Sequence, residues 1–175
     1  MAADSAYTCH IMVSCRTPIF AILTSLFAAS PSIPSQQPIV FAFDVKITLS
    51  DKAAMWLKMR HESIIVSADY SGEPKKDAMG RANEIGMINL GVENVEVIGA
   101  EGLVRVTGTK IDLKRLDWIK GPVMLNVNLY SGRHSSPDNI LACDFFDGKL
   151  SSAVRKTPAL HCSLIEEQDK TRHRD

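Results

Sequence analysis

The side chains best suited to covalent chemistry fall within one short stretch, His134, Ser135, Ser136 and Asp138. An imidazole, a hydroxyl and a carboxylate are the groups of a nucleophilic triad. A triad requires the imidazole to contact the hydroxyl and the carboxylate to orient the imidazole, and closeness in sequence does not supply that geometry. The chain also lacks the Gly-x-Ser-x-Gly turn that exposes a serine nucleophile. A small secreted hydrolase that pairs His134 with a serine of the 131–139 loop is therefore an alternative function and not the leading one.

Metal binding finds little support in the spacing of the histidine, acidic and cysteine residues. His61 and Glu62 are adjacent and have no ligand-type partner four residues away on a helical face. Asp138, Asp144 and Asp147 do not form the loop of alternating aspartates that binds calcium. The cysteines are not arranged in the close pairs of a zinc site. The sequence predicts neither a metal nor another cofactor.

An apolar run over residues 18–29 follows Arg16 and precedes a segment rich in serine and proline. A basic residue, roughly 7–15 apolar residues and then small residues are typical of a secretory signal peptide. We interpret residues 1–30 as the signal peptide and residues 31–42 as a linker that contains the cleavage region, with Met12 as a second candidate start. The alternative is that the apolar run is a buried element of the fold.

Removal of the signal peptide would leave two of the four cysteines, Cys143 and Cys162. Disulfides form and persist in oxidising compartments. The sequence is compatible with a bridge between these two residues and also with a buried free thiol at Cys143, which lies in an apolar segment. We predict an exported protein, either periplasmic or extracellular.

Charge balance restricts the kinds of partner. Twenty basic and twenty acidic residues give the 175-residue chain a formal net charge of zero. Nucleic-acid binding driven by counterion release needs a basic excess, so we expect no nucleic-acid partner. The apolar runs are shorter than the ~20 residues that span a bilayer, so we expect no stable membrane span after signal removal.

Strand-like segments dominate the chain from residue 43 onward, because apolar and polar residues alternate with a period of two. The expected strands are 43–50, 64–70, 84–90, 94–98, 103–109, 123–130 and 140–146, with short helices at 52–59 and 112–119. Seven strands predict a mainly antiparallel all-β domain over residues 43–150, a β-sandwich of immunoglobulin-like or transthyretin-like type. An α+β fold, with the two helices packed on an antiparallel sheet, is the alternative. The serine-containing start and charged end of residues 151–175 predict a disordered tail.

The alternation is clearest over residues 123–130. One face of this strand carries Val127 and Leu129, and the other carries Asn126, Asn128 and Tyr130. Asparagine is depleted in strands and needs hydrogen-bond partners when it is buried. We expect this face to be exposed and its asparagines to be ordinary surface residues. The alternative is that they line a shallow polar binding face together with Tyr130.

Two similar strand ends carry the candidate binding residues. Tyr70-Ser71-Gly72 ends the second expected strand, Tyr130-Ser131-Gly132 ends the sixth, and a polar loop with a proline follows each. In a seven-strand immunoglobulin-like sandwich these two strands run in the same direction in opposite sheets, so their loops would meet at one end. That topology predicts a single mixed-charge patch. Its residues are Glu73, Lys75, Lys76, Asp77, Arg81, Arg133, His134, Ser135 and Asp138.

Together these features favour a small exported binding domain without catalytic activity. It would recognise a protein or a cell-envelope component through loops at one end of the sandwich. Besides the hydrolase, a structural subunit of an envelope assembly is an alternative.

Overall fold

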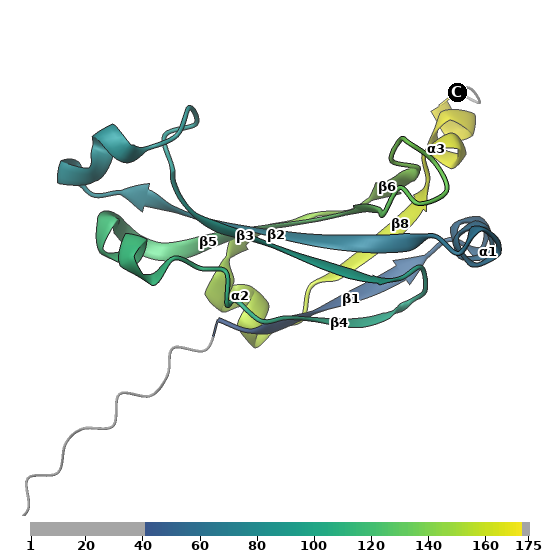
Figure 1. The fold of residues 1–175 in the computed structure, drawn as a ribbon, viewed down its shortest axis with the longest axis horizontal. Helices are drawn as coiled ribbons and strands as arrows, with labels where there is room; N and C mark the ends of the chain where they lie inside the picture. Colours follow the sequence, from purple (N-terminus) through teal and green to yellow (C-terminus); the bar gives the residue numbers. More distant parts are fainter. Residues whose placement is uncertain (1–40, 173–175) are drawn as a thin grey trace, which may run out of the picture. The chain divides into compact units, whose positions relative to one another are not determined.

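The computed structural model describes residues 41–172, which form a sandwich of two four-stranded sheets (Figure 1). The strand order of the first sheet is β4 (Gly102–Val106), β1 (Phe43–Leu49), β8 (Ala159–Leu164) and β6 (Leu141–Cys143). The strand order of the second sheet is β3 (Ile88–Ile98), β2 (Ser63–Pro74), β5 (Ile119–Ser131) and β7 (Phe146–Lys149). The prediction of an all-β, mainly antiparallel sandwich is confirmed. The expected signal peptide and residues 31–40 of the linker lie outside the described residues.

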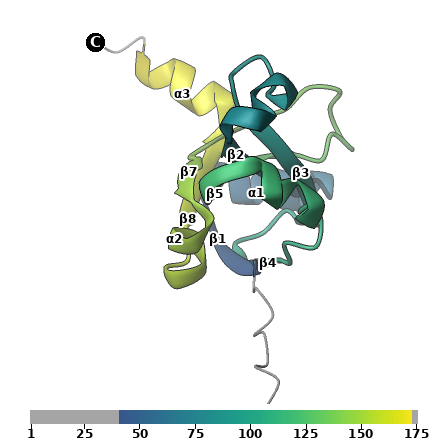
Figure 2. The same ribbon diagram turned by 90° about the vertical axis from the view of Figure 1, so that its left-hand side faces the viewer.

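The helices are short. They are α1 (Asp51–Arg60), α2 (Leu150–Arg155), α3 (Ile165–Arg172) and the 3-10 helices η1 (Lys76–Arg81) and η2 (Leu113–Trp118). The α1 helix lies at one end of the sandwich, and α2 lies beside β7 and β8 (Figures 1 and 2). The two expected helices, 52–59 and 112–119, correspond to α1 and to η2, which lies at the opposite end of β2. They do not form a layer over a sheet, which the α+β alternative required. None of the helices in the described residues is long and apolar enough to cross a membrane.

The core is built from the predicted alternation. Phe43, Val45 and Ile47 of β1 and Leu125 and Val127 of β5 are each at most 2% exposed. Burying an apolar side chain of this size contributes about 1.5–3 kcal/mol. A shift of either strand by one residue would place polar side chains in the core, so burial fixes the register.

The segments 84–90 and 94–98, predicted as two strands, are one strand with a bulge. β3 runs without a break from Ile88 to Ile98, and its pairing with β2 shifts next to Gly91. Gly91 has a φ of 136°, a conformation that glycine adopts without strain. Gly91 therefore does not mark a turn between two strands; it lies at a bulge within one strand. Residues 84–87 belong to the preceding turn, in which the Asn83 side chain accepts hydrogen bonds from two backbone N–H groups.

The segment 140–146, predicted as one strand, is divided between the two sheets. Its first part is β6 of the first sheet, and after Asp144 and Phe145 the chain enters β7 of the second sheet. A local pattern of apolar residues does not distinguish one strand from two short strands that switch sheets.

The prediction of a disordered tail over 151–175 is wrong for the residues that the structure describes. β8 lies inside the first sheet, parallel to β1 and antiparallel to β6. Its alternating residues Leu160, Cys162 and Leu164 are buried. A disulfide joins Cys143 to Cys162 between β6 and β8. The alternation in β8 is only six residues long and is followed by a charged end, so composition alone predicts disorder there.

Removing the disulfide should lower the free energy of unfolding by about 3 kcal/mol, because a bond across 19 residues restricts the unfolded chain. Denaturant titration of the double variant Cys143→Ala/Cys162→Ala against the oxidised wild type measures this difference. Wild type held in reductant is the matched control and should unfold like the double variant. Equal unfolding free energies for the oxidised wild type and the variant would contradict the prediction.

Candidate functional site

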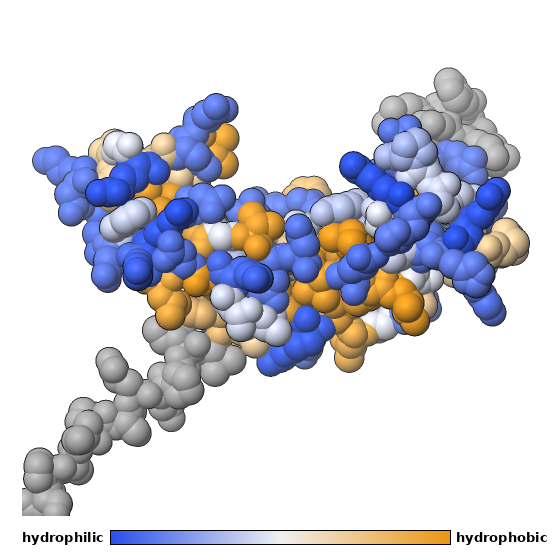
Figure 3. Space-filling model, in the orientation of Figure 1, coloured by the Kyte–Doolittle hydropathy of each residue, from blue (hydrophilic) through white to orange (hydrophobic). Residues whose placement is uncertain are grey.

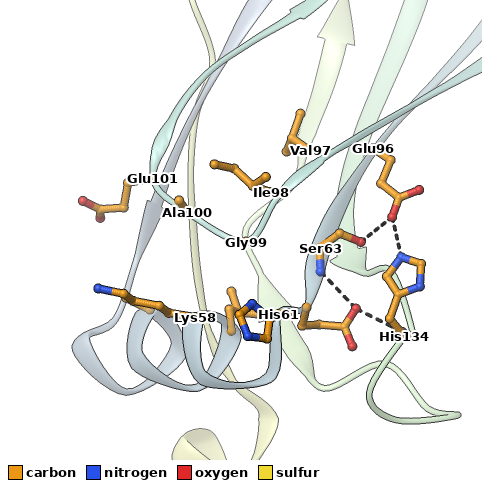
Figure 4. A pocket seen from close by; sticks show the side chains of 13 residues that line it. Lys58, His61, Ser63, Glu96, Val97, Ile98, Gly99, Ala100, Glu101 and His134 are labelled. Carbon is orange, nitrogen blue, oxygen red and sulfur yellow. Dashed lines mark hydrogen bonds and ion pairs between the residues drawn. The ribbon is translucent and has the colours of Figure 1, made fainter.

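A cleft of about 860 Å³ lies where α1 ends and β2 begins (Figure 4). We call it the α1-end cleft. Its walls come from α1, the start of β2, the end of β3 with the following turn, and the loop after β5. Its polar and charged lining residues are Lys58, His61, Glu62, Ser63, Glu96, Glu101 and His134.

The buried carboxylate of Glu62 joins the walls of this cleft. Its Oε1 accepts hydrogen bonds from the backbone N–H groups of Ser63 and His134, both at 3.1 Å. Its Oε2 accepts from the backbone N–H of Ser135 at 2.7 Å and from the Ser135 hydroxyl at 2.5 Å. Glu62 is only 3% exposed. Burial alone would raise its pKa, but these four hydrogen bonds lower the pKa from 4.5 to about 2. Glu62 is therefore a charged group at neutral pH, held entirely by N–H and O–H donors.

Local backbone geometry delivers Glu62 to this place. Ser50 caps the start of α1 by accepting a hydrogen bond from the backbone N–H of Ala53. The helix ends at His61, which has a left-handed φ of 52°, and the Glu62 N–H bonds back to the Leu57 carbonyl. The Glu62 carbonyl accepts from the N–H of Gly99, where an added Cβ would lie 2.3 Å from that oxygen. Only glycine fits at residue 99 without a shift of the backbone.

The loop after β5 is anchored at both ends. Its Gly132 N–H donates to the Ser63 carbonyl at 3.0 Å, and a Cβ on Gly132 would collide with the Ser63 hydroxyl. The Asn139 side chain accepts from the Ser131 N–H at 2.9 Å, and the Ile140 N–H donates to the Ser131 hydroxyl. Between these anchors, the backbone bonds to Glu62 fix the stretch that carries His134.

His134 and Glu96 form the exposed rim of the cleft. The His134 Nε2 lies 2.5 Å from the Glu96 Oε1, and the same oxygen accepts from the Ser63 hydroxyl at 2.6 Å (Figure 4). The hydrogen bond to Glu96 and the charge of that carboxylate raise the pKa of His134. The hydrogen bonds from His134 and Ser63 lower the pKa of Glu96. Both shifts favour the charged pair, in which His134 carries a proton.

The structure separates the predicted patch into two groups. β2 and β5, the second and sixth expected strands, are antiparallel neighbours in one sheet, with Ile64 opposite Ser131 and Pro74 opposite Ile119. Loops that follow antiparallel neighbours emerge at opposite ends, so the prediction of convergence is wrong. Four residues lie at the α1 end: Arg133, His134, Ser135 and Asp138. Glu73, Lys75, Lys76, Asp77 and Arg81 lie at the other end.

The residues at the far end mostly hold local structure. The Arg81 guanidinium lies 4.4 Å from the centre of the Trp118 ring, and the Lys75 Nζ donates to the Asp117 carbonyl at 2.6 Å. Glu73 pairs with Lys120 at 2.6 Å on the exposed surface. Trp118 is half-buried, packs against the core and lies beneath Arg81.

The hydroxyl and imidazole groups of the 131–139 loop do not assemble into a triad in the structure. The Ser135 hydroxyl donates to Glu62, and the His134 ring faces Glu96. The Ser136 hydroxyl accepts from the backbone N–H of Asp138 within a turn. A general base must contact the nucleophile, so the hydrolase alternative gains no support from this arrangement. Among the described residues, no group of three or more His, Cys, Asp and Glu side chains is placed to hold a metal ion.

Sequence reasoning found His134 and Ser135 but missed Glu62, Ser63 and Glu96. Glu62 meets Ser135 across 73 positions and Glu96 meets His134 across 38. Local spacing contains no such information. The one available signal was the placement of Glu62 directly between a helix and an apolar strand, where a buried carboxylate can organise a junction.

Comparison of the chain with models of protein families, with characterised proteins and with solved structures gives no match. Function must therefore be argued from the site itself.

Glu62→Gln should lower the free energy of unfolding by about 2–3 kcal/mol at neutral pH, because the amide is uncharged and replaces one acceptor with a donor. The folded pKa lies below the ordinary value, so the contribution of the carboxylate is complete above pH 4.5 and disappears as pH falls towards 2. Urea titration across that range should show wild type and variant converging in acid. The exposed Glu84→Gln is the control and should match wild type throughout. A difference between wild type and Glu62→Gln that is constant with pH would contradict this account.

Proposed function

We propose that this protein is a small exported binding domain without catalytic activity, and that it holds a segment of a protein partner in the α1-end cleft. The volume of about 860 Å³ lies in the range of ligand-binding clefts. Arg133, His134, Ser135 and Asp138 form the partner-facing loop, and the far-end residues lie outside the site.

The observation that carries this proposal is an apolar strip between charged rims. Ile98 is 81% exposed at the cleft, with the half-buried Val97 beside it and Ala100 after the glycine. Leu103 of β4 is also 69% exposed. Figure 3 shows apolar side chains grouped along the β3 and β4 edges of this face. Contiguous exposed apolar surface with a polar rim is typical of protein-binding sites.

The rims carry both signs of charge. Glu96 and Glu101 supply carboxylates and Lys58 supplies positive charge, to which His134, whose pKa Glu96 raises, adds when it is protonated. Opposite charges around an apolar centre orient a partner and exclude wrong ones. The Glu62 hydrogen bonds hold the loop before a partner arrives, which reduces the entropy lost on binding.

Export is supported by the disulfide between Cys143 and Cys162, since such bonds persist mainly in oxidising compartments. In such a compartment the natural partners are secreted or envelope proteins.

Partners captured from an envelope and secretion extract by the immobilised chain should be identified, purified and titrated. Ile98→Ser and the double variant Arg133→Ala/His134→Ala should each raise the dissociation constant about tenfold or more, because contacts at a buried interface centre contribute above 1 kcal/mol. The matched control is Lys76→Ala/Lys114→Ala, which removes two positive charges at the far end. Weakening by the control alone, or by none of the three, would reject the α1-end cleft as the binding site.

A further inference from the structure

A second concave feature lies on the outer face of the β3-β2-β5-β7 sheet. Its volume is about 520 Å³, and residues 83–87 rise beside β2 and β5 to form one wall. In Figure 3 the upper outline of the molecule drops beside the raised left-hand end, above β2 and β5 of Figure 1. We call this feature the polar trough.

One row of side chains crosses the trough from strand to strand. Asp69 of β2 is opposite Asn126 of β5, and Asn126 is opposite Asp147 of β7. All three line the trough. Two strand spacings separate the two aspartates, which places their backbones about 9–10 Å apart.

These residues are unusual for their positions. β2 and β5 are the interior strands of the sheet, where aspartate and asparagine are disfavoured. No salt bridge joins Asp69 or Asp147 to a basic side chain among the described residues. The Asn128 Nδ2 donates to the Asn126 Oδ1 at 2.5 Å, which leaves the Asn128 carbonyl oxygen as an acceptor. Side chains that oppose the local strand preference without a structural bond are expected at functional positions.

The chemistry of the lining defines the ligand. Two carboxylates and several amide and hydroxyl groups line the trough, and no basic side chain does. Burial raises the pKa of Asp69, which marks a carboxylate that lacks a positive partner. Ile85, Met87 and Met124 add apolar surface. The two carboxylates favour a cationic ligand over an anionic one, and the apolar side chains suit methylene groups.

We propose that the polar trough binds a short aliphatic diamine or a polyamine. One ammonium group would contact Asp69, a second would contact Asp147 across β5, and the methylene chain would lie against Met87 and Met124. The Asn128 carbonyl oxygen would accept a remaining ammonium N–H. This site is separate from the α1-end cleft and does not depend on the function proposed for it.

Putrescine is the probe, and butylamine, with the same four-carbon chain and one ammonium group, is its matched control. Amide-resolved NMR titration of the isotope-labelled chain should show shifts confined to β2, β5, β7 and residues 83–87. Putrescine should bind about three- to fivefold more tightly than butylamine, the effect expected of one additional exposed ion pair.

The charge-neutral variants Asp69→Asn and Asp147→Asn keep side-chain size and should each remove that preference. Asp77→Asn, which deletes an exposed carboxylate at η1, is the control and should retain it. Three results would overturn the proposal. Wild type could bind the two amines with equal affinity, the shifts could spread over other acidic surfaces, or all three variants could lose the preference for putrescine equally. Because partner capture is measured separately with Ile98→Ser, failure here and failure of the α1-end cleft are distinguishable.

Discussion

The α1 end of the sandwich depends on the buried carboxylate of Glu62, which forms no salt bridge within the described part of the chain. Glu62 retains its charge because four N–H and O–H donors from Ser63, His134 and Ser135 surround it. Leaving a buried charge without such donors is strongly unfavourable, so the loop after β5 has little freedom to take another path. The positions of the His134 ring, its Glu96 partner and the whole rim of the cleft follow from that constraint. Functional side chains on this loop therefore have a rigid support, although the loop itself is exposed.

The same device recurs at two other junctions. Glu93, 6% exposed, accepts from the backbone N–H groups of Thr107 and Gly108 and so fastens the segment after β4 to β3. Glu167 of α3 accepts from the N–H of Leu164 and from the hydroxyl of Ser50, the cap of α1. Glutamate is suited to this task because its carboxylate accepts several hydrogen bonds at the end of a flexible stem. The Glu167 carboxylate thus connects the end of β8 to the start of α1, which ties the C-terminal helix α3 to the fold.

Much of the architecture was readable from the sequence, because it follows from local alternation. The alternating faces of β1 and β5 and the two brief helices were predicted from local spacing alone. The errors share a cause: each concerned a relation between distant segments. Gly91 marks a turn or a bulge according to what pairs with the strand, and β8 is a strand only because β1 and β6 flank it. The candidate site shows the same limit. The neighbouring loop residues His134 and Ser135 were predicted, but their distant partners Glu96 and Glu62 were not.

The two proposed sites make different demands on the same scaffold. The α1-end cleft is assembled at a junction, so its shape depends on hydrogen bonds between segments distant in sequence. The polar trough needs no such assembly, because sheet geometry alone sets the spacing of Asp69 and Asp147 through their common neighbour Asn126. The trough lowers the stability of the sheet, because aspartate and asparagine have a weak preference for interior strands. Burial of Leu125 and Val127 on the opposite face of β5 offsets that cost, so one strand can keep a close-packed face in the core and a polar face free for a ligand.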